Sequence, residues 1–128
     1  MPGLLNLPLA TLLLETLQAN PHLHDRNVWA EVRPDGVAHC VAGWTVTLAG
    51  AIWVPTPMPG MVSWRGQLRS IPVLTQELLG LTTFQAQTLI YHSDEQQAVD
   101  LLKGWIAEAR AHQHAQLARL ERELGRAG

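Results

Sequence analysis

The stretch HCVAGWTVTLAG at residues 39–50 decides the fold because it carries no formal charge in twelve residues. Its apolar side chains run almost without a break, and this pattern predicts a short helix that is buried on nearly all sides. Gly50 stands at its end, where a helix favours a residue with positive φ. Ala42 and Gly43 are small enough to let other backbones approach, while Trp44 fills volume. We therefore expect the other elements to pack around this helix.

The composition limits the classes of protein to which this chain can belong. A chain of 128 residues forms one compact domain, and 47% apolar with 16% charged residues is typical of a globular protein. The formal net charge of −2 gives no general attraction to nucleic acid or to anionic lipid. Cys40 is the single cysteine, so an internal disulfide is excluded and we expect a cytoplasmic protein.

The sequence does not suggest a membrane anchor or a signal peptide. The longest apolar run, at residues 40–54, has 15 residues, whereas a bilayer span needs about 20. The leucine-rich start of the chain lacks a positively charged segment and a small-residue cleavage site, so we expect no signal peptide. We therefore expect no membrane partner.

The residues before the central stretch predict two helices and a turn. Leucines at helical spacing over residues 4–19 predict a first helix with one wet face, which Asn20-Pro21 ends. Asp25 is expected to cap a second, short helix that reaches Val32. Residues 34–36, Pro-Asp-Gly, are a turn signal that leads into the central helix.

The segment after the central stretch predicts irregular structure with one small hairpin. Residues 52–54 are apolar and β-prone, and three prolines between residues 55 and 59 then forbid regular structure. Residues 61–64 and 67–69 flank Arg65-Gly66, which predicts a hairpin with its turn at this dipeptide. Trp53 and Trp64 lie in this insertion and are candidate contacts for a partner protein, because an exposed tryptophan is a good anchor.

Helices resume at Pro72. Gly80 is expected to end the first of them, and Thr82 with Gln85 has the spacing of a capping box for the next, which buries Phe84 and ends near residue 91. Ser93 is expected to cap the last helix, which nothing stops before about residue 125. The fold class is therefore mainly α, a compact helical domain around the buried central helix.

The last helix is too long for the domain. About 31 residues at about 1.5 Å each reach about 46 Å, whereas a compact domain of this size is about 30–35 Å across. Its second half presents a narrow stripe of Leu117, Leu120 and Leu124 among charged residues. We expect residues 1–104 to form the compact domain and residues 105–128 to extend beyond it as a self-association element. The alternatives are that this end folds back onto its own domain or frays in solution.

Cys40 and the histidines are the first chemical candidates. A cysteine beside a histidine is typical of nucleophiles and metal ligands, but neighbours on a helix point about 100° apart. We favour a small buried core residue for Cys40 and expect no catalytic residue, metal or cofactor. A metal-dependent enzyme that uses Cys40 with His22, His24 and His39 is the alternative.

The pattern of residues 74–90 predicts two helices joined by a turn at Gly80-Leu81. A helix-turn-helix DNA-binding protein has the same order of elements. However, no lysine or arginine occurs from residue 70 to residue 102, and phosphate contacts carry most of the affinity of such readers. A plain helical corner is the preferred interpretation, and DNA binding stays an alternative.

Two parts of the chain follow a wider pattern. One is the pattern C-G-T-x-x-C-V-A-G-W followed by a small apolar helix that ends in A-G, which the chain matches at Gly36, at residues 40–44 and at residues 49–50; the other is L-L-G-L-T, which matches residues 78–82. In these motifs the chain resembles a group of small uncharacterised proteins from bacteria, notably actinobacteria, and their phages. The resemblance covers residues 5–102. Asp35 replaces the first cysteine of the pattern and Val37 replaces the threonine, so a paired-cysteine metal or redox site is excluded here.

Together these observations predict a small non-enzymatic helical protein that acts by protein–protein contact. We expect a homodimer or other homo-oligomer through the last helix, together with an unidentified protein partner. An accessory factor of a phage or mobile element is the role that we expect from the missing catalytic residues, the overhanging helix and the tryptophans of the proline-rich insertion.

Overall fold

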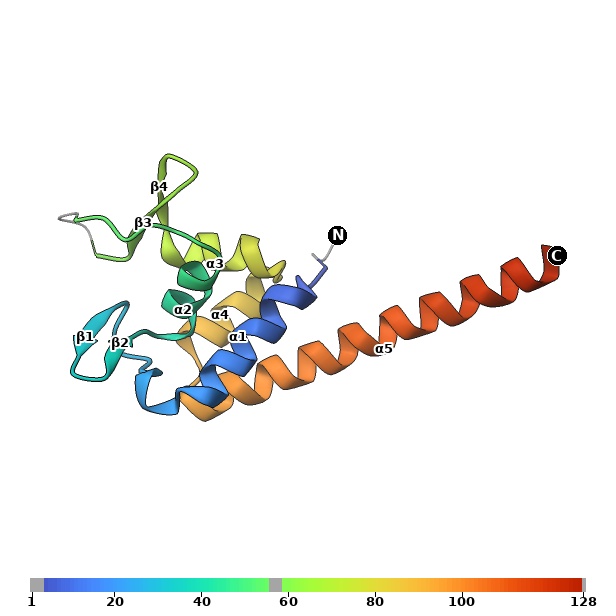
Figure 1. Ribbon diagram of the computed structural model, residues 1–128, viewed down its shortest axis with the longest axis horizontal. Helices are drawn as coiled ribbons and strands as arrows, with labels where there is room; N and C mark the ends of the chain where they lie inside the picture. The colour runs from blue at the N-terminus through green and yellow to red at the C-terminus, as the bar shows by residue number, and fades with distance from the viewer. Residues whose placement is uncertain (1–3, 56–58, 128) are drawn as a thin grey trace.

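The computed structural model describes residues 4–55 and 59–127, without the side chain of residue 127. The described residues form a mainly α structure with two small antiparallel hairpins, as Figure 1 shows. The helices are α1 (Leu7–Ala19), a short 3-10 turn η1 (Pro21–Leu23), α2 (Val41–Leu48), α3 (Ile71–Leu79), α4 (Thr83–Tyr91) and α5 (Glu95–Ala127). The strands are β1 (Glu31–Arg33), β2 (Gly36–Ala38), β3 (Met61–Trp64) and β4 (Gln67–Ser70). The predicted fold class is confirmed.

The central stretch forms α2, which lies between two hydrophobic clusters. Val41 belongs to a cluster built mainly from α1, α4 and α5, whereas Ala42 and Val46 belong to a cluster with β3 and α3. Cys40 is the N-cap residue, and its Sγ accepts a hydrogen bond from the backbone N–H of Gly43. α2 therefore joins the two clusters, and five of its eight residues are buried, in agreement with the predicted buried helix.

α1 packs along the first turns of α5, with its chain direction opposite to that of α5 (Figure 1). The side chain of Asn6 caps α1, a proline occupies its first turn, and the helix ends before Asn20. The buried side of α1 is formed by Ala10, Leu13 and Leu17. Both predicted ends of this helix lie within a few residues of the observed ones.

The predicted short helix from Asp25 to Val32 is wrong, because this segment forms a loop and β1. The carboxylate of Asp25 accepts hydrogen bonds from the backbone N–H of Asn27 and from the guanidinium of Arg33, which holds the chain in a turn. Backbone bonds from Asp25 to His39 and from residue 40 to residue 28 then tie the loop to the start of α2. The Pro-Asp-Gly turn is present, but it connects β1 to β2.

The second hairpin agrees with the sequence. β3 pairs with β4, and the turn residues Arg65 and Gly66 have φ values of 51° and 79°. Both values lie in the left-handed region that a two-residue hairpin turn requires. Residues 56–58, which include Pro57, lie outside the described residues.

The capping predictions for the last three helices are mostly confirmed. Gly80 ends α3 with φ 71°, and Thr82 and Gln85 form a complete capping box at α4. Two details are wrong. Phe84 is 80% exposed, because α4 buries Ala86 and Leu89 instead. The cap of α5 is Asp94, which exchanges hydrogen bonds with Gln97, whereas the hydroxyl of Ser93 donates back to the carbonyl of residue 89.

α5 extends far beyond the rest of the molecule (Figure 1). Its 33 residues reach about 50 Å at about 1.5 Å each. Ile106 is the last buried side chain among the described residues of α5, two residues beyond the predicted domain boundary. The described part of α5 after this point continues as one helix and does not fold back onto the domain. None of the described helices is long and apolar enough to cross a membrane.

Candidate functional site: the overhanging half of the last helix

The overhanging half of α5 presents a row of exposed leucines. Leu117, Leu120 and Leu124 are 55%, 50% and 65% exposed. A monomeric globular protein tolerates single exposed leucines, but three in one row on a helix are an apolar stripe without a neighbour. The structure therefore places all three predicted residues on one open surface.

This stripe lies on the same side of α5 as the residues of its first half that pack into the core. Leu117, Leu120 and Leu124 lie eighteen residues after the first-half residues Val99, Leu102 and Ile106, respectively. Eighteen residues make five turns of about 3.6 residues, so both sets share one side of the helix. Val99 is half-buried, and Leu102 and Ile106 are buried in the main cluster. This side of α5 is thus covered in its first half and open in its second, with Arg110 and Gln113 between the two apolar sets.

Polar residues border the open half of this face. Gln113 interrupts the stripe, while His114 and Glu121 lie on one flank and Gln116 and Glu123 on the other, by their helical positions. Arg119, Arg122 and Arg126 lie on the far side, whereas Arg110 lies on the side of the stripe, seven residues before Leu117. A narrow apolar stripe with polar flanks is typical of a helix that pairs with another helix.

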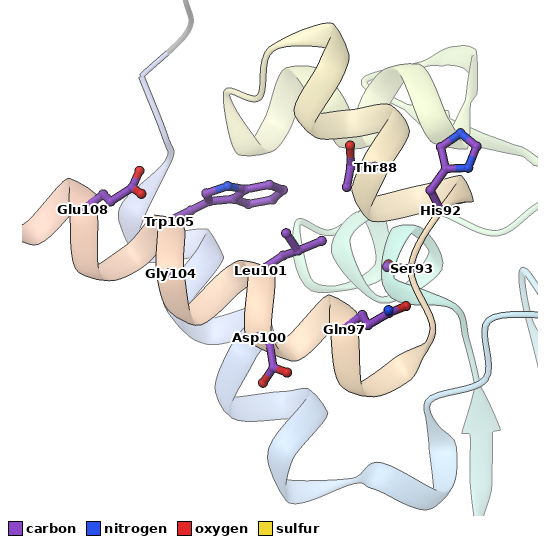
Figure 2. A pocket seen from close by; sticks show the side chains of 9 residues that line it. All are labelled: Thr88, His92, Ser93, Gln97, Asp100, Leu101, Gly104, Trp105 and Glu108. Atoms are coloured by element: carbon purple, nitrogen blue, oxygen red, sulfur yellow. The ribbon is translucent and has the colours of Figure 1, made fainter.

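A groove opens where α5 leaves the domain, as Figure 2 shows. It lies between α4 and α5 and has a volume of about 470 Å³. The ring of Trp105 reaches across it toward Thr88 of α4, with Leu101 beside it, whereas Asp100 points away from α4. Trp105 packs partly against the main cluster. The groove borders the overhang but holds no convergent set of catalytic groups.

The two tryptophans of the proline-rich insertion are half-buried. The Trp53 ring stacks on His39 with centroids 5.3 Å apart, and its indole N–H donates to Thr47 Oγ1. Trp64 packs against the second cluster, and the guanidinium carbon of Arg65 lies 5.2 Å from the centre of its ring. Both tryptophans therefore have intramolecular partners in addition to their exposed edges.

Cys40 and His39 are built into the core. Burial raises the pKa of the Cys40 thiol, and its Sγ already serves as the cap of α2. The Nδ1 of His39 lies 2.8 Å from the carbonyl oxygen of Trp29, and burial lowers the pKa of its imidazole. A thiol that burial keeps protonated is a poor nucleophile and a poor metal ligand.

His24 and His22 make other interactions. His24 forms an isolated backbone bridge with His39, and burial lowers the pKa of its imidazole despite the nearby Glu95 and Asp25. His22 lies on the surface, with its Nε2 3.2 Å from a carboxylate oxygen of Asp35. Among the residues that the structure describes, no three His, Cys, Asp or Glu side chains are grouped as metal ligands.

α3 and α4 follow each other in the order of a helix-turn-helix, but α4 lacks the positive charge of a DNA-recognition helix. No lysine or arginine occurs in either helix, and the nearby Arg69 guanidinium pairs with the carboxylate of Glu77. The exposed residues of α4 include Phe84 and Tyr91, which do not attract phosphate. This geometry gives DNA binding no support.

Comparisons with protein-family models, with curated proteins and with solved structures find no match for this chain.

Proposed function

We propose that this protein acts through protein–protein contact, and that the overhanging half of α5 pairs with the same helix of a second copy. The single observation that carries this proposal is the row of Leu117, Leu120 and Leu124 on the apolar side of α5, which the described residues of one chain leave exposed. A second copy brings an identical stripe, so the surface is self-complementary in the way a two-fold dimer requires.

The charges favour an antiparallel pair. With Leu117 of one copy opposite Leu120 of the other, four leucines meet at the centre and Leu124 lies opposite Gln113. His114 then lies on the same flank as Glu121 of the second copy, whereas a parallel pair places Arg110, seven residues before Leu117, opposite Arg110 of the second copy. Electrostatic repulsion between these like charges disfavours the parallel arrangement.

The length of the overhang suits this register. Each helix ends beside residue 110 of the other, four residues beyond Ile106, so the compact parts stay clear of each other. The contact is a short zipper with three leucines from each copy. We therefore expect a dissociation constant of about 1–100 μM, corresponding to a modest binding free energy of about −8 to −5 kcal/mol.

Sedimentation equilibrium of matched variants tests this proposal. We expect the unchanged chain to approach twice its 14.1 kDa mass as its concentration rises through the micromolar range. Leu120→Glu should stay at 14.1 kDa throughout, because it buries a charge in the stripe. Ala111→Glu adds the same charge on the opposite side of the helix and should behave like the unchanged chain.

Two results would refute the proposal. One is a monomeric mass of the unchanged chain up to millimolar concentration. The other is an equal loss of association in Leu120→Glu and Ala111→Glu, since the stripe would then have no special role. Circular dichroism of each variant shows whether the helix itself is retained.

We also propose a cytoplasmic location and an accessory role in a phage or mobile element. The lone, buried Cys40 supports the first, and the likeness of residues 36–50 to proteins of bacteria and their phages supports the second. The exposed edges of Trp53 and Trp64 offer a separate surface for a further protein partner.

A further inference from the structure

An apolar pocket lies between the β1–β2 hairpin and α2, away from the overhang of α5. Its volume of about 500 Å³ falls within the range of about 300–1,000 Å³ that is usual for small-molecule sites. The lining comes from η1, the hairpin, α2 and the segment after α2, and consists of Leu23, Ala30, Val32, Val37, His39, Trp44, Thr47 and Trp53.

The hairpin wall of this pocket is unusually apolar for an exposed strand pair. Val32 and Val37 are directly opposite each other in the β1–β2 ladder, so both side chains point to the same face. Val32 is 85% exposed and Val37 is 38% exposed. Two neighbouring valines that line a pocket and remain open to solvent are available to cover an apolar ligand.

Most polar groups of the pocket are already paired. The indole N–H of Trp44 donates to the carbonyl of Leu23, and that of Trp53 donates to Thr47 Oγ1. The hydroxyl of Thr47 donates in turn to the carbonyl of Gly43. These groups fix the walls and leave little hydrogen-bonding capacity for a ligand.

His39 is the exception. Its residue surface is only 4% exposed, and its Nδ1 lies against a carbonyl oxygen, which can only accept. Nδ1 therefore carries the proton of the neutral ring, and Nε2 is left as an acceptor. No described residue bonds to Nε2. The lowered pKa of the imidazole, caused by burial, keeps the ring neutral at pH 7.

We propose that this pocket binds a small, flat, largely apolar molecule with one hydroxyl of phenol type, which donates a hydrogen bond to His39 Nε2. The ring of Trp44, edge-on to His39, and the ring of Trp53, stacked on it, suit a ring-shaped ligand. This inference is independent of the self-association of α5, because none of the pocket residues belongs to that helix.

Titration with a pair of probes tests the proposal. Para-cresol has the required hydroxyl, whereas para-xylene has the same shape with a methyl group in its place. We expect both to quench or shift tryptophan fluorescence saturably, with para-cresol about tenfold tighter because of one additional hydrogen bond, to His39 Nε2. Absence of saturable binding, or equal affinity of the two probes, would overturn the proposal.

Three variants locate the binding. His39→Phe keeps an aromatic ring but removes the acceptor, so para-cresol should lose its tenfold advantage while para-xylene still binds. Val32→Ser changes an exposed wall residue that the fold does not need and should weaken both probes severalfold. Val73→Ser alters an exposed valine on α3 and should change neither affinity. Undiminished binding of both probes to Val32→Ser would place them elsewhere and refute the assignment.

Discussion

At the residue scale, Gly43 shows how a small side chain determines the packing of α2. The sequence predicts that small residues of the central helix admit another backbone, and the backbone that approaches is the Trp29 carbonyl. A Cβ atom at Gly43 would collide with this oxygen and would lie 3.0 Å from the Cβ of His39. The sequence cannot name Trp29 as the neighbour, because that contact depends on a loop whose conformation is set by long-range bonds.

Two glycine-to-alanine substitutions should therefore have opposite effects. Gly43→Ala should lower the free energy of unfolding by about 2–3 kcal/mol, because the Trp29 carbonyl must move and its bond to His39 Nδ1 is disturbed. Gly104→Ala should raise it by about 1 kcal/mol, since a Cβ there meets nothing and alanine favours the helix. Urea unfolding of both variants measures this, and destabilisation by Gly104→Ala with a neutral Gly43→Ala would contradict the packing described.

At the element scale, helices with strong local signals are the most predictable parts of the chain. Gly80, Thr82 and Gln85 act within one turn of their own position, so their roles at α3 and α4 follow from spacing alone. The β1–β2 hairpin was not predicted, because its loop is held by Arg33 and by backbone bonds to residues near position 40. The apolar pocket beside this hairpin was missed for the same reason.

The junction of η1 with the start of α2 makes stability sensitive to acid. His24 and His39 form the backbone bridge at this junction, and burial lowers the pKa of both imidazoles below the usual 6.5. Below that value the unfolded chain takes up protons that the folded chain does not. The free energy of unfolding should therefore be steady above about pH 7.5 and fall as the pH drops through 6.5 toward 5.

Urea midpoints between pH 8 and pH 5, at one fixed protein concentration, measure this dependence. His24→Gln should flatten the slope, because it removes one of the two buried groups that resist protonation. Midpoints that stay constant or rise on acidification would show that the two imidazoles accept protons freely in the folded protein.

At the scale of the whole molecule, the outstanding feature is the imbalance between a compact body and a long free helix. The sequence predicts the overhang from length alone, since about 31 helical residues exceed the diameter of the domain. It also locates the leucine stripe. The structure adds that the stripe lies on the same side as Val99, Leu102 and Ile106, which is visible only once the helix is known to be unbroken.

The most direct test of tail pairing is disulfide cross-linking between copies with single introduced cysteines. Cys40 is buried, so it will not compete for oxidation. A mixture of Leu117→Cys and Leu120→Cys chains should form the mixed disulfide within minutes at micromolar concentration, identified by mass spectrometry. Leu124→Cys alone and Ala111→Cys alone should remain largely uncross-linked, because an antiparallel pair separates each from its own counterpart. Cross-linking of Ala111→Cys as fast as the mixed pair, or none at all in the mixed pair, would contradict the proposed contact between the two helices.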